Sequence, residues 1–369
     1  LNEETGKYLL NENPNYPQAD QPGPTASRFT PNTPVGFSTT TDVGSQYGAT
    51  FDGFTVFATS TYMVPPGGNT RERNRGLALF GGGETPSKVN SIEFINVQSM
   101  GIAKDFGDFT STSGDVKALG SSTRGVFRTN YSPSSRNTLE FTTFAAASNS
   151  IDFGDLVIAV GQRPGASNQT RGIFSGGLFP GSTTHNEMDL ITIATAGNAT
   201  DFGNLSVSRA DTSALASSTR MIVGGGYTPS TNYGNVMDFV TIATTGNASD
   251  FGDLNTGKRA GTAVASSTRG IFGPGKAPSV SDVIDFVTIA TTGNAFDFGD
   301  LTQARWLVAA TSNSIRGIWG GGYNPSPAAE YDIIDFVTIA STGNAIDFGN
   351  LQTSKRSVGA CSNGHGGLG

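Results

Sequence analysis

Apolar and polar residues alternate in short runs along most of the chain, and helical periodicity is absent. The stretch 284–290, Ile-Asp-Phe-Val-Thr-Ile-Ala, is typical, because it is β-branched and aromatic with apolar residues on both alternating faces. A strand that is buried on both sides has this pattern. Thr-Gly-Asn-Ala follows at 292–295, where Gly-Asn supplies the positive φ angles of a tight hairpin. The pattern predicts many short strands joined by tight turns.

The predicted strands belong to a repeat of 47–50 residues, which four markers define in fixed order. The first marker is an Arg that opens an apolar strand and is followed by Gly in all copies but one: Arg75, Arg124, Arg171, Arg220, Arg269 and Arg316. The second is an acidic residue inside an apolar run: Glu93, Glu140, Asp189, Asp238, Asp285 and Asp335. The third is Asp-Phe-Gly, which begins at Asp105, Asp152, Asp201, Asp250, Asp297 and Asp347. The fourth is a run rich in Ala and Ser, such as 262–268.

Each repeat predicts four short strands, and periods of this length with four strands are typical of propeller blades. One blade cannot bury both of its faces, so neighbouring blades must stack and the ring must close. The predicted fold is therefore all-β, a six-bladed β-propeller of four-stranded blades over residues 75–369. A seventh, degenerate blade is the alternative, with a strand at 54–63 that pairs with the tail 364–369.

The N-terminal segment differs in character from the repeats. Residues 1–40 hold six prolines, many Asn and Gln, and few apolar residues, which favours an extended chain. We expect an assembly arm that docks on a neighbouring subunit or partner, with an unattached tail as the alternative. Residues 41–74 are predicted to be a connector or the strands of a degenerate blade.

Composition excludes several classes of protein. Charged residues make up only 14% of the chain and Gly occurs 50 times, which disfavours helical bundles. The net charge is −7 without a basic run, so a nucleic-acid groove is not expected. No apolar stretch is long enough to span a membrane. A single Cys excludes an internal disulfide and a site built from several cysteines.

The repeated motifs carry structural rather than catalytic predictions. Six copies of Asp-Phe-Gly, without a glycine-rich loop or a catalytic His-Arg-Asp motif, exclude the kinase interpretation. The six Arg and six acidic residues are expected to form ion pairs within or between blades, and a charged ligand-binding ring is the alternative. The two His residues, His185 and His365, lie in dissimilar contexts, so no metal site is expected. We therefore predict no cofactor, no metal and no enzymatic activity.

The loops after the Arg-Gly strands vary most between repeats, and several carry aromatic residues. Variable loops on a rigid scaffold are where binding function concentrates. Sugar or protein recognition is one interpretation of these loops, and ordinary loop variation is the other. The candidate ligand or partner residues are Tyr131, Phe179, Tyr227, Tyr233, Tyr323 and Tyr331.

The strands that end in Gly-Gly resemble those of kelch and galactose-oxidase-like propellers. The regular downstream Trp of kelch repeats and the copper ligands of the oxidase are missing, so oxidase activity is not implied. The wording Ser-Ser-Thr-Arg-Gly-Ile-Phe at 266–272, together with 284–295 and the closing Cys-Ser-Asn-Gly-His-Gly-Gly-Leu at 361–368, resembles repeats of virion structural proteins of tailed bacteriophages, especially those of marine cyanobacteria. The resemblance covers roughly residues 75–369.

This resemblance implies a non-enzymatic structural protein of the phage particle, in the tail or fibre or attached to the capsid. Its expected partners are other virion proteins, copies of itself and a host-surface glycan met by the variable loops. Nucleic acid and membrane insertion are not expected. Two alternatives remain: a secreted propeller that binds carbohydrate or protein, and a glycosidase-like hydrolase, which needs paired carboxylates or an Arg cluster at the axis.

Overall fold

The computed structural model describes residues 76–130, 137–179 and 183–368, which belong to the unit Arg71–Gly369. These residues form antiparallel strands and one short 3-10 helix, η2 (Gly366–Leu368), and the described ranges contain no α-helix. The predicted all-β class is therefore confirmed. The predicted arm at 1–40, the connector at 41–74 and the strand at 54–63 lie outside the described residues.

Four sheets share one design of four antiparallel strands in sequence order. The first consists of β8 (Gly165–Ser167), β9 (Arg171–Leu178), β10 (Thr184–Thr192) and β11 (Thr200–Asn204). The second consists of β12 (Ser213–Ala216), β13 (Arg220–Gly226), β14 (Gly234–Thr241) and β15 (Ser249–Asp253). The third consists of β16 (Ala263–Ala265), β17 (Arg269–Phe272), β20 (Val283–Thr288) and β21 (Phe296–Asp300). The fourth consists of β22 (Ala309–Ser312), β23 (Arg316–Gly320), β26 (Ile333–Thr338) and β27 (Ile346–Asn350).

The remaining sheet joins two such groups through one long strand. Its order is β28 (Gly359–Ser362), β1 (Leu77–Gly81), β3 (Ser87–Asn96), β4 (Lys104–Gly120), β5 (Arg124–Asn130), β6 (Thr138–Thr143) and β7 (Ile151–Asp155). The part of β4 up to Ser113 pairs with β3, and the part from Gly114 onward pairs with β5. Strand β4 is thus the last strand of one repeat and the first strand of the next.

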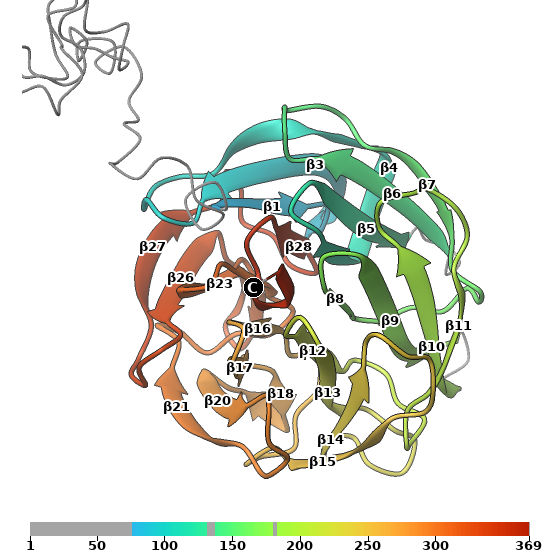
Figure 1. Cartoon of the computed structure of the whole chain (residues 1–369). Helices are drawn as coiled ribbons and strands as arrows, with labels where there is room; N and C mark the ends of the chain where they lie inside the picture. The colour runs from blue at the N-terminus through green and yellow to red at the C-terminus, as the bar shows by residue number, and fades with distance from the viewer. Residues whose placement is uncertain (1–75, 131–136, 180–182, 369) are drawn as a thin grey trace, which may run out of the picture. The chain divides into compact units, whose positions relative to one another are not determined.

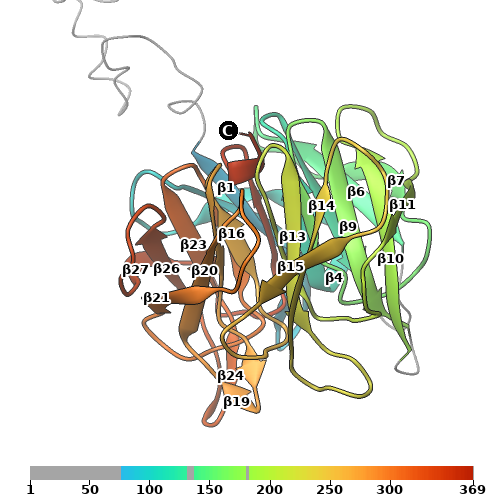
Figure 2. The ribbon, with the colours of Figure 1, turned by 60° about the horizontal axis from the view of Figure 1, so that its bottom comes forward.

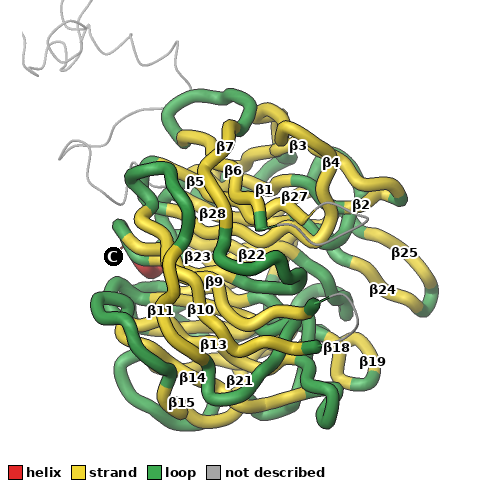
Figure 3. Tube along the Cα trace, turned by 90° about the vertical axis from the view of Figure 1, so that its right-hand side faces the viewer, coloured by secondary structure: helices red, strands yellow, loops and turns green. Residues whose placement is uncertain are grey.

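Short two-stranded elements lie on one face of this unit. Strand β2 (Glu84–Thr85) pairs with β3, β18 (Lys276–Ala277) pairs with β19 (Ser279–Val280), and β24 (Tyr323–Pro325) pairs with β25 (Ala328–Glu330). Figure 3 shows these elements on the side opposite the C-terminus, and Figure 2 shows β19 and β24 on that side. We call this side the hairpin face.

Each of the four sequence markers occupies one strand of a repeat. The predicted hairpin is present, since β20 pairs with β21 across 289–295, but Gly-Asn does not form a tight turn. Strand β20 ends at Thr288, and a turn closed by the Thr291 N–H on the Thr288 carbonyl follows at once. The segment Thr-Gly-Asn-Ala then docks on the preceding sheet. There the Gly293 N–H donates to the Phe251 carbonyl (2.7 Å), and the Asn294 side-chain oxygen accepts from the Asp253 N–H (3.0 Å).

Asp-Phe-Gly forms the other half of this contact between sheets. Phe251 is 1% exposed and packs in the core, as the copies in the other repeats do. Gly252 has φ +135°, and a Cβ at this position would lie 2.5 Å from the Gly293 carbonyl oxygen. Glycine is therefore required, because the next sheet approaches too closely for any side chain. The last repeat meets the first in the same way, since the Gly101 N–H donates to the Phe348 carbonyl (3.0 Å).

The apolar core is divided into layers between neighbouring sheets. One cluster combines Phe251 and Met237 of the β12–β15 sheet with Phe272 and Val287 of the following sheet. Another combines residues of the first and last repeats. Burial between sheets explains why each strand is apolar on both faces.

The two ends of the described chain meet in one sheet, where β1 pairs with β28 in antiparallel register. The first strands of the repeats also contact one another in order, from β4 to β8, β12, β16, β22 and β28, and β28 contacts β4 again. Figure 1 shows the sheets arranged around a common centre. The series of contacts between repeats thus returns to its starting point.

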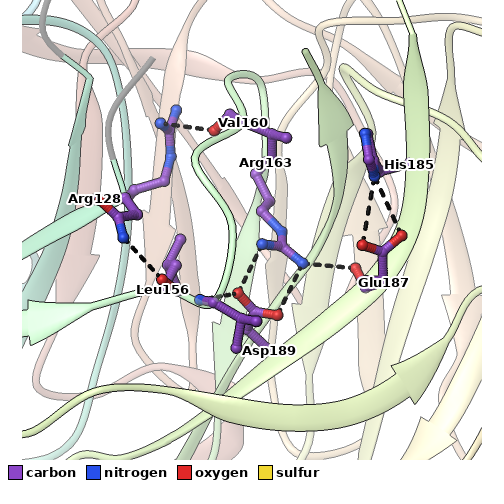
Figure 4. Close-up of polar contacts among 9 residues, drawn as sticks. Arg128, Leu156, Val160, Arg163, His185, Glu187 and Asp189 are labelled. Atoms are coloured by element: carbon purple, nitrogen blue, oxygen red, sulfur yellow. Dashed lines mark hydrogen bonds and ion pairs between the residues drawn. The ribbon is translucent and has the colours of Figure 1, made fainter.

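The acidic markers are buried, but their predicted partners are wrong. They pair with a different basic residue that lies just before or at the start of a first strand: Arg163–Asp189, Arg209–Asp238, Lys258–Asp285, Arg305–Asp335 and Lys355–Glu93. Figure 4 shows Arg163 donating to both carboxylate oxygens of Asp189, at 2.7 and 3.1 Å. The sixth acid, Glu140, instead accepts from the hydroxyl groups of Thr110 and Ser150, both at 2.6 Å.

The Arg markers connect neighbouring repeats without an acidic partner. Arg220 stacks on Phe239 of its own sheet, 4.6 Å from the ring centroid, and donates to the carbonyls of Ile289 and Ala290 in the next sheet. The other described markers make the same type of bond: Arg124 to Ile193, Arg171 to Ile242, Arg269 to Ile339 and Arg316 to Val97. Arg75 lies outside the described residues. The Arg set therefore joins neighbouring repeats, one of the two arrangements that were left open, and its acceptors are backbone carbonyls rather than carboxylates.

Breaking the buried pair that joins the last repeat to the first tests its role. Lys355→Met leaves the Glu93 carboxylate buried and without its cation, so we expect the free energy of unfolding to fall by about 3–5 kcal/mol. Urea denaturation of the full chain measures this change. Adding Glu93→Met is expected to restore most of the loss, because the uncompensated charge is removed. A loss below about 1 kcal/mol for Lys355→Met alone contradicts the assigned role.

Candidate ligand-binding cavity at the hairpin face

The first strands of the repeats surround a narrow channel. One small residue from each repeat lines it at the same level: Ala118, Gly165, Ala214, Ala263, Ala310 and Ala360. The two cavities that share this ring are each about 60 Å³, room for a few water-sized molecules only. The runs of Ala and Ser noted in the sequence therefore allow the strands to approach closely and leave no space for a larger ligand.

Hydroxyl groups tie these strands to one another around the channel. The Ser167 Oγ donates to the Gly120 carbonyl at 2.7 Å, and the Ser312 Oγ donates to the Ala265 carbonyl at 2.9 Å. The Ser362 hydroxyl donates to the Ser312 carbonyl. Each of these hydrogen bonds joins two sheets. Neighbouring sheets are therefore hydrogen-bonded to each other at the channel as well as at their outer strands.

The C-terminal tail covers the channel on the side away from the hairpins. The Gly367 N–H donates to His365 Nδ1 (3.2 Å), so Nε2 carries the proton and donates to the Gly120 carbonyl (2.7 Å). Leu368 is 1% exposed in η2. The tail is thus not a strand, and the alternative of a seventh blade built with 364–369 is wrong in this respect.

A larger cavity of about 680 Å³ lies at the hairpin face. Its wall includes the aromatic residues Tyr227, Trp306 and Tyr323 and the charged residues Glu84, Asp115, Asp211, Arg259 and Arg356. This volume falls in the usual range of small-molecule sites, about 300–1,000 Å³. It therefore offers space for a ligand larger than water.

A ring of six left-handed residues supports this cavity. Each repeat places one non-glycine residue with φ between 51° and 59° just before its first strand or, for Asp115, inside β4: Asp115, Gln162, Asp211, Ala260, Leu307 and Ser357. Backbone bonds join neighbours in the ring, such as the Ala260 N–H to the Asp211 carbonyl (2.8 Å). All of them except Ala260 line the cavity. The conformation costs roughly 1–2 kcal/mol for an ordinary side chain, so the sheets impose it.

Cations lie over aromatic rings around the cavity. Arg259 lies 5.2 Å from the ring centroid of Tyr227, and Lys276 lies 5.2 Å from that of Trp306. Arg356 lies 4.8 Å from the Tyr323 centroid and also forms ion pairs with Glu84 (3.0 Å) and Glu330 (3.2 Å). These contacts fix the orientation of the side chains that face the cavity.

Two carboxyl groups of the ring differ in their electrostatic surroundings. Burial raises the pKa of Asp211 to about 6, with a further contribution from Asp115, against the opposing charges of Lys117 and Arg259. Burial would also raise the pKa of Asp115, but the charges of Lys117 and Arg128 and the Gln162 N–H outweigh it and lower the pKa. Asp115 accepts from Arg128 (3.1 Å) and from the Gln162 N–H (2.9 Å). The cavity therefore contains one easily protonated and one firmly ionised carboxyl group.

Two of the six predicted loop residues line this cavity. Tyr227 and Tyr323 line it, whereas Tyr233 stacks under Arg259 at 5.8 Å and Phe179 packs edge-on against His185 at 4.8 Å. Tyr331 bonds through its backbone to Gly322 and Lys355, and Tyr131 lies outside the described residues.

Arg259, Trp306 and Arg356 were not among the predicted site residues. Each follows a buried basic residue directly, in Lys258-Arg259, Arg305-Trp306 and Lys355-Arg356. The signal that could have found them is that in four of the six repeats this position varies while the residue before it is basic.

Two features of the described ranges concern metal binding and thiol chemistry. They contain no group of three or more His, Cys, Asp or Glu residues that could hold a metal ion. Cys361 is buried, and burial raises the pKa of its thiol, so it packs as a small apolar group. Within the same ranges, no helix is long and apolar enough to cross a membrane.

Replacing a strained ring residue by glycine tests the cost of the left-handed conformation. Ala260→Gly is expected to raise the free energy of unfolding by about 0.5–1 kcal/mol, because glycine adopts positive φ without penalty. Ala214→Gly is the matched control in strand β12, where glycine should lower stability by a similar amount. Chemical denaturation measures both, and equal effects of the same sign would show that φ is not the cause.

Asp211→Asn tests the electrostatics of the cavity. An Asp with a pKa near 6 in the folded protein and 3.8 in the unfolded chain loses stability as the pH rises between these values. Asn keeps the left-handed geometry and stays neutral. We expect the variant to gain about 1–2 kcal/mol at pH 7, after allowance for partial exposure, and nothing below pH 4. Denaturation at both pH values measures this, with exposed Asp201→Asn as the control that should show no gain.

Comparison with protein-family models and with curated proteins gives no match for this chain. Its function must therefore follow from the repeats, the cavity and the residues that surround it.

Proposed function

We propose that the six repeats form a closed, six-bladed β-propeller. The pairing of β1 with β28 carries this proposal, because it places the two ends of the repeat region in one sheet. Two contacts between the last and first repeats support it: Arg316 with the Val97 carbonyl, and the Gly101 N–H with the Phe348 carbonyl. They repeat the contacts found between the other neighbouring sheets, as closure by rotation requires. Lys355 with Glu93 repeats the pair found within the other sheets, and here it joins the two ends of the repeat region.

We further propose that this propeller is a non-enzymatic structural component of a tailed-phage virion. The amino-acid sequence of the repeats resembles that of virion structural proteins, and this resemblance supports a location in the phage particle. The contacts between sheets at the outer strands, in the apolar layers and around the channel support a stiff body. In this proposal the Pro-rich segment 1–40 attaches the body to other virion proteins or to copies of the chain.

The alternative of a carbohydrate- or protein-binding propeller gains support from the cavity at the hairpin face. Its aromatic and hydrogen-bonding wall is of the type that small-molecule sites use. A virion protein that contacts the host also needs a binding site of this kind. This alternative therefore differs from the virion proposal mainly in where the protein is located.

The hydrolase alternative rests on one observation, the opposite pKa shifts of Asp211 and Asp115. A glycosidase needs one protonated and one ionised carboxyl group. Against this role, Asp115 is engaged by Arg128, Lys117 and the Gln162 N–H, which leaves little of the carboxylate for a substrate. We therefore place Asp115 in the framework of the cavity.

Antibody labelling tests the virion proposal. Antibodies raised against the purified full chain are expected to decorate intact particles of the phage that encodes it, and the chain should band with the particles in a density gradient. A chain found only in the soluble fraction of the lysate contradicts the proposed location. Release of reducing sugar from host polysaccharide by the purified chain, and its loss in Asp211→Asn, would contradict the non-enzymatic role.

A further inference from the structure

Two side chains of opposite charge, Asp211 and Arg259, line the cavity at the hairpin face without an ionic partner. Within the part of the chain that the structure describes, the Asp211 carboxylate and the Arg259 guanidinium group form no hydrogen bond or ion pair, either with each other or with another group. The carboxylate oxygens and the terminal guanidinium nitrogens are open to solvent, whereas Arg259 Nε is inaccessible. Charged groups that are drawn away from bulk water are normally paired. Two free charges at one cavity therefore indicate a ligand that pairs with them.

The other charges of the cavity wall already have partners. Glu84 forms an ion pair with Arg356 at 3.0 Å. Asp115 forms ion pairs with Arg128 and Lys117, both at 3.1 Å. The wall therefore leaves one negative and one positive group for a ligand.

The backbone places the two free charges beside each other. Asp211 and Ala260 are neighbours in the ring of left-handed residues, where the Ala260 N–H donates to the Asp211 carbonyl at 2.8 Å. Arg259 directly precedes Ala260, and its guanidinium group lies 5.2 Å from the ring centroid of Tyr227 and 5.8 Å from that of Tyr233. The two rings orient the guanidinium group but leave its charge in place. Adjacent repeats thus present opposite charges to one space.

A small zwitterion matches this arrangement. Its ammonium group is attracted by the Asp211 carboxylate, and its carboxylate accepts charge-assisted hydrogen bonds from the terminal nitrogens of Arg259. A simple anion or a simple cation is attracted by one of the two groups and repelled by the other. Leu178, Trp306 and Leu307 add apolar surface to the same wall, which suits an apolar side chain. Free α-amino acids combine these three features.

We infer that the cavity at the hairpin face binds a free α-amino acid with an apolar side chain, its carboxylate on Arg259 and its ammonium group on Asp211. The inference goes beyond the proposed structural role of the protein, and it does not depend on a location in the virion.

Ligands that lack one of the two charges provide the first test. The full chain is titrated by calorimetry with leucine, methionine and phenylalanine, and with the 2-hydroxy acid and the amide of each. We expect saturable binding of at least one free amino acid. Its hydroxy acid lacks the ammonium group and its amide lacks the carboxylate, so each is expected to bind at least about tenfold more weakly. Trp306 lines the cavity whereas Trp319 is fully buried, so a change in tryptophan fluorescence should accompany binding.

Two variants assign the contacts. Asp211→Asn and Arg259→Met each remove one charge at nearly constant size, and each is expected to weaken binding of the free amino acid at least about tenfold. Asp211→Asn should also abolish the preference over the hydroxy acid, and Arg259→Met the preference over the amide. A purely structural role of either residue does not produce this exchange of preferences. Exposed Lys104→Met is the control that should bind like the unchanged protein, and circular dichroism establishes that each variant is folded.

The pH dependence of binding provides a further readout. Burial and the charge of Asp115 raise the pKa of Asp211 to about 6, against the opposing charges of Lys117 and Arg259. Asp115 itself stays ionised, because its pKa is lowered. Protonated Asp211 no longer attracts an ammonium group, so affinity is expected to fall between pH 7.5 and pH 5. Asp211→Asn should bind with the same, weaker affinity at both pH values.

The possible failures are distinguishable. Folded, unchanged protein that binds none of the free amino acids, that binds the hydroxy acid or the amide as tightly, or that binds equally well after both substitutions overturns this inference. Those outcomes leave the propeller and virion proposals untouched. A chain that is absent from purified phage particles overturns the virion proposal whether or not it binds an amino acid.

Discussion

The antiparallel pairing of β1 with β28 is the interaction on which the remaining structure depends. Every repeat buries both faces of its sheet against neighbours, so an open end would expose a complete apolar layer to water. The layer between the last and first repeats contains Phe80, Ile95, Phe336 and Phe348, all nearly inaccessible. Pairing of the chain ends keeps this layer closed and brings Lys355 to Glu93, from opposite ends of the repeat region.

Neighbouring sheets contact each other in three ways, and the kind of contact changes with the distance from the centre. At the outer strands, Asp-Phe-Gly approaches the next repeat so closely that only glycine fits. In the middle, aromatic and aliphatic side chains interlock in an apolar layer. Near the channel, small side chains and Ser hydroxyl groups join the first strands. Neighbouring repeats are therefore joined at three distances from the centre.

The same constraints decide where a ligand can bind. The channel is too narrow, and its far end is covered by His365 and η2. At the hairpin face, by contrast, the sheets hold six residues in the left-handed conformation, and five of them, with Arg259, Trp306 and Arg356 beside them, line one cavity. The residue types at these positions differ between repeats. The scaffold contacts and the cavity thus use different positions of one repeat.

The sequence by itself determined the all-β class and the four strands of each repeat, because these follow from local periodicity and from the recurrence of residue types. It also indicated aromatic loops, of which Tyr227 and Tyr323 reach the cavity. Only the tertiary structure decided that Asp238 pairs with Arg209 rather than with a marker Arg, and that Thr-Gly-Asn-Ala docks on the preceding sheet. It alone brought Gln162, Arg259 and Trp306 to one space. Partners between sheets depend on how neighbouring repeats are rotated and stacked, and spacing along the chain carries no information about that rotation.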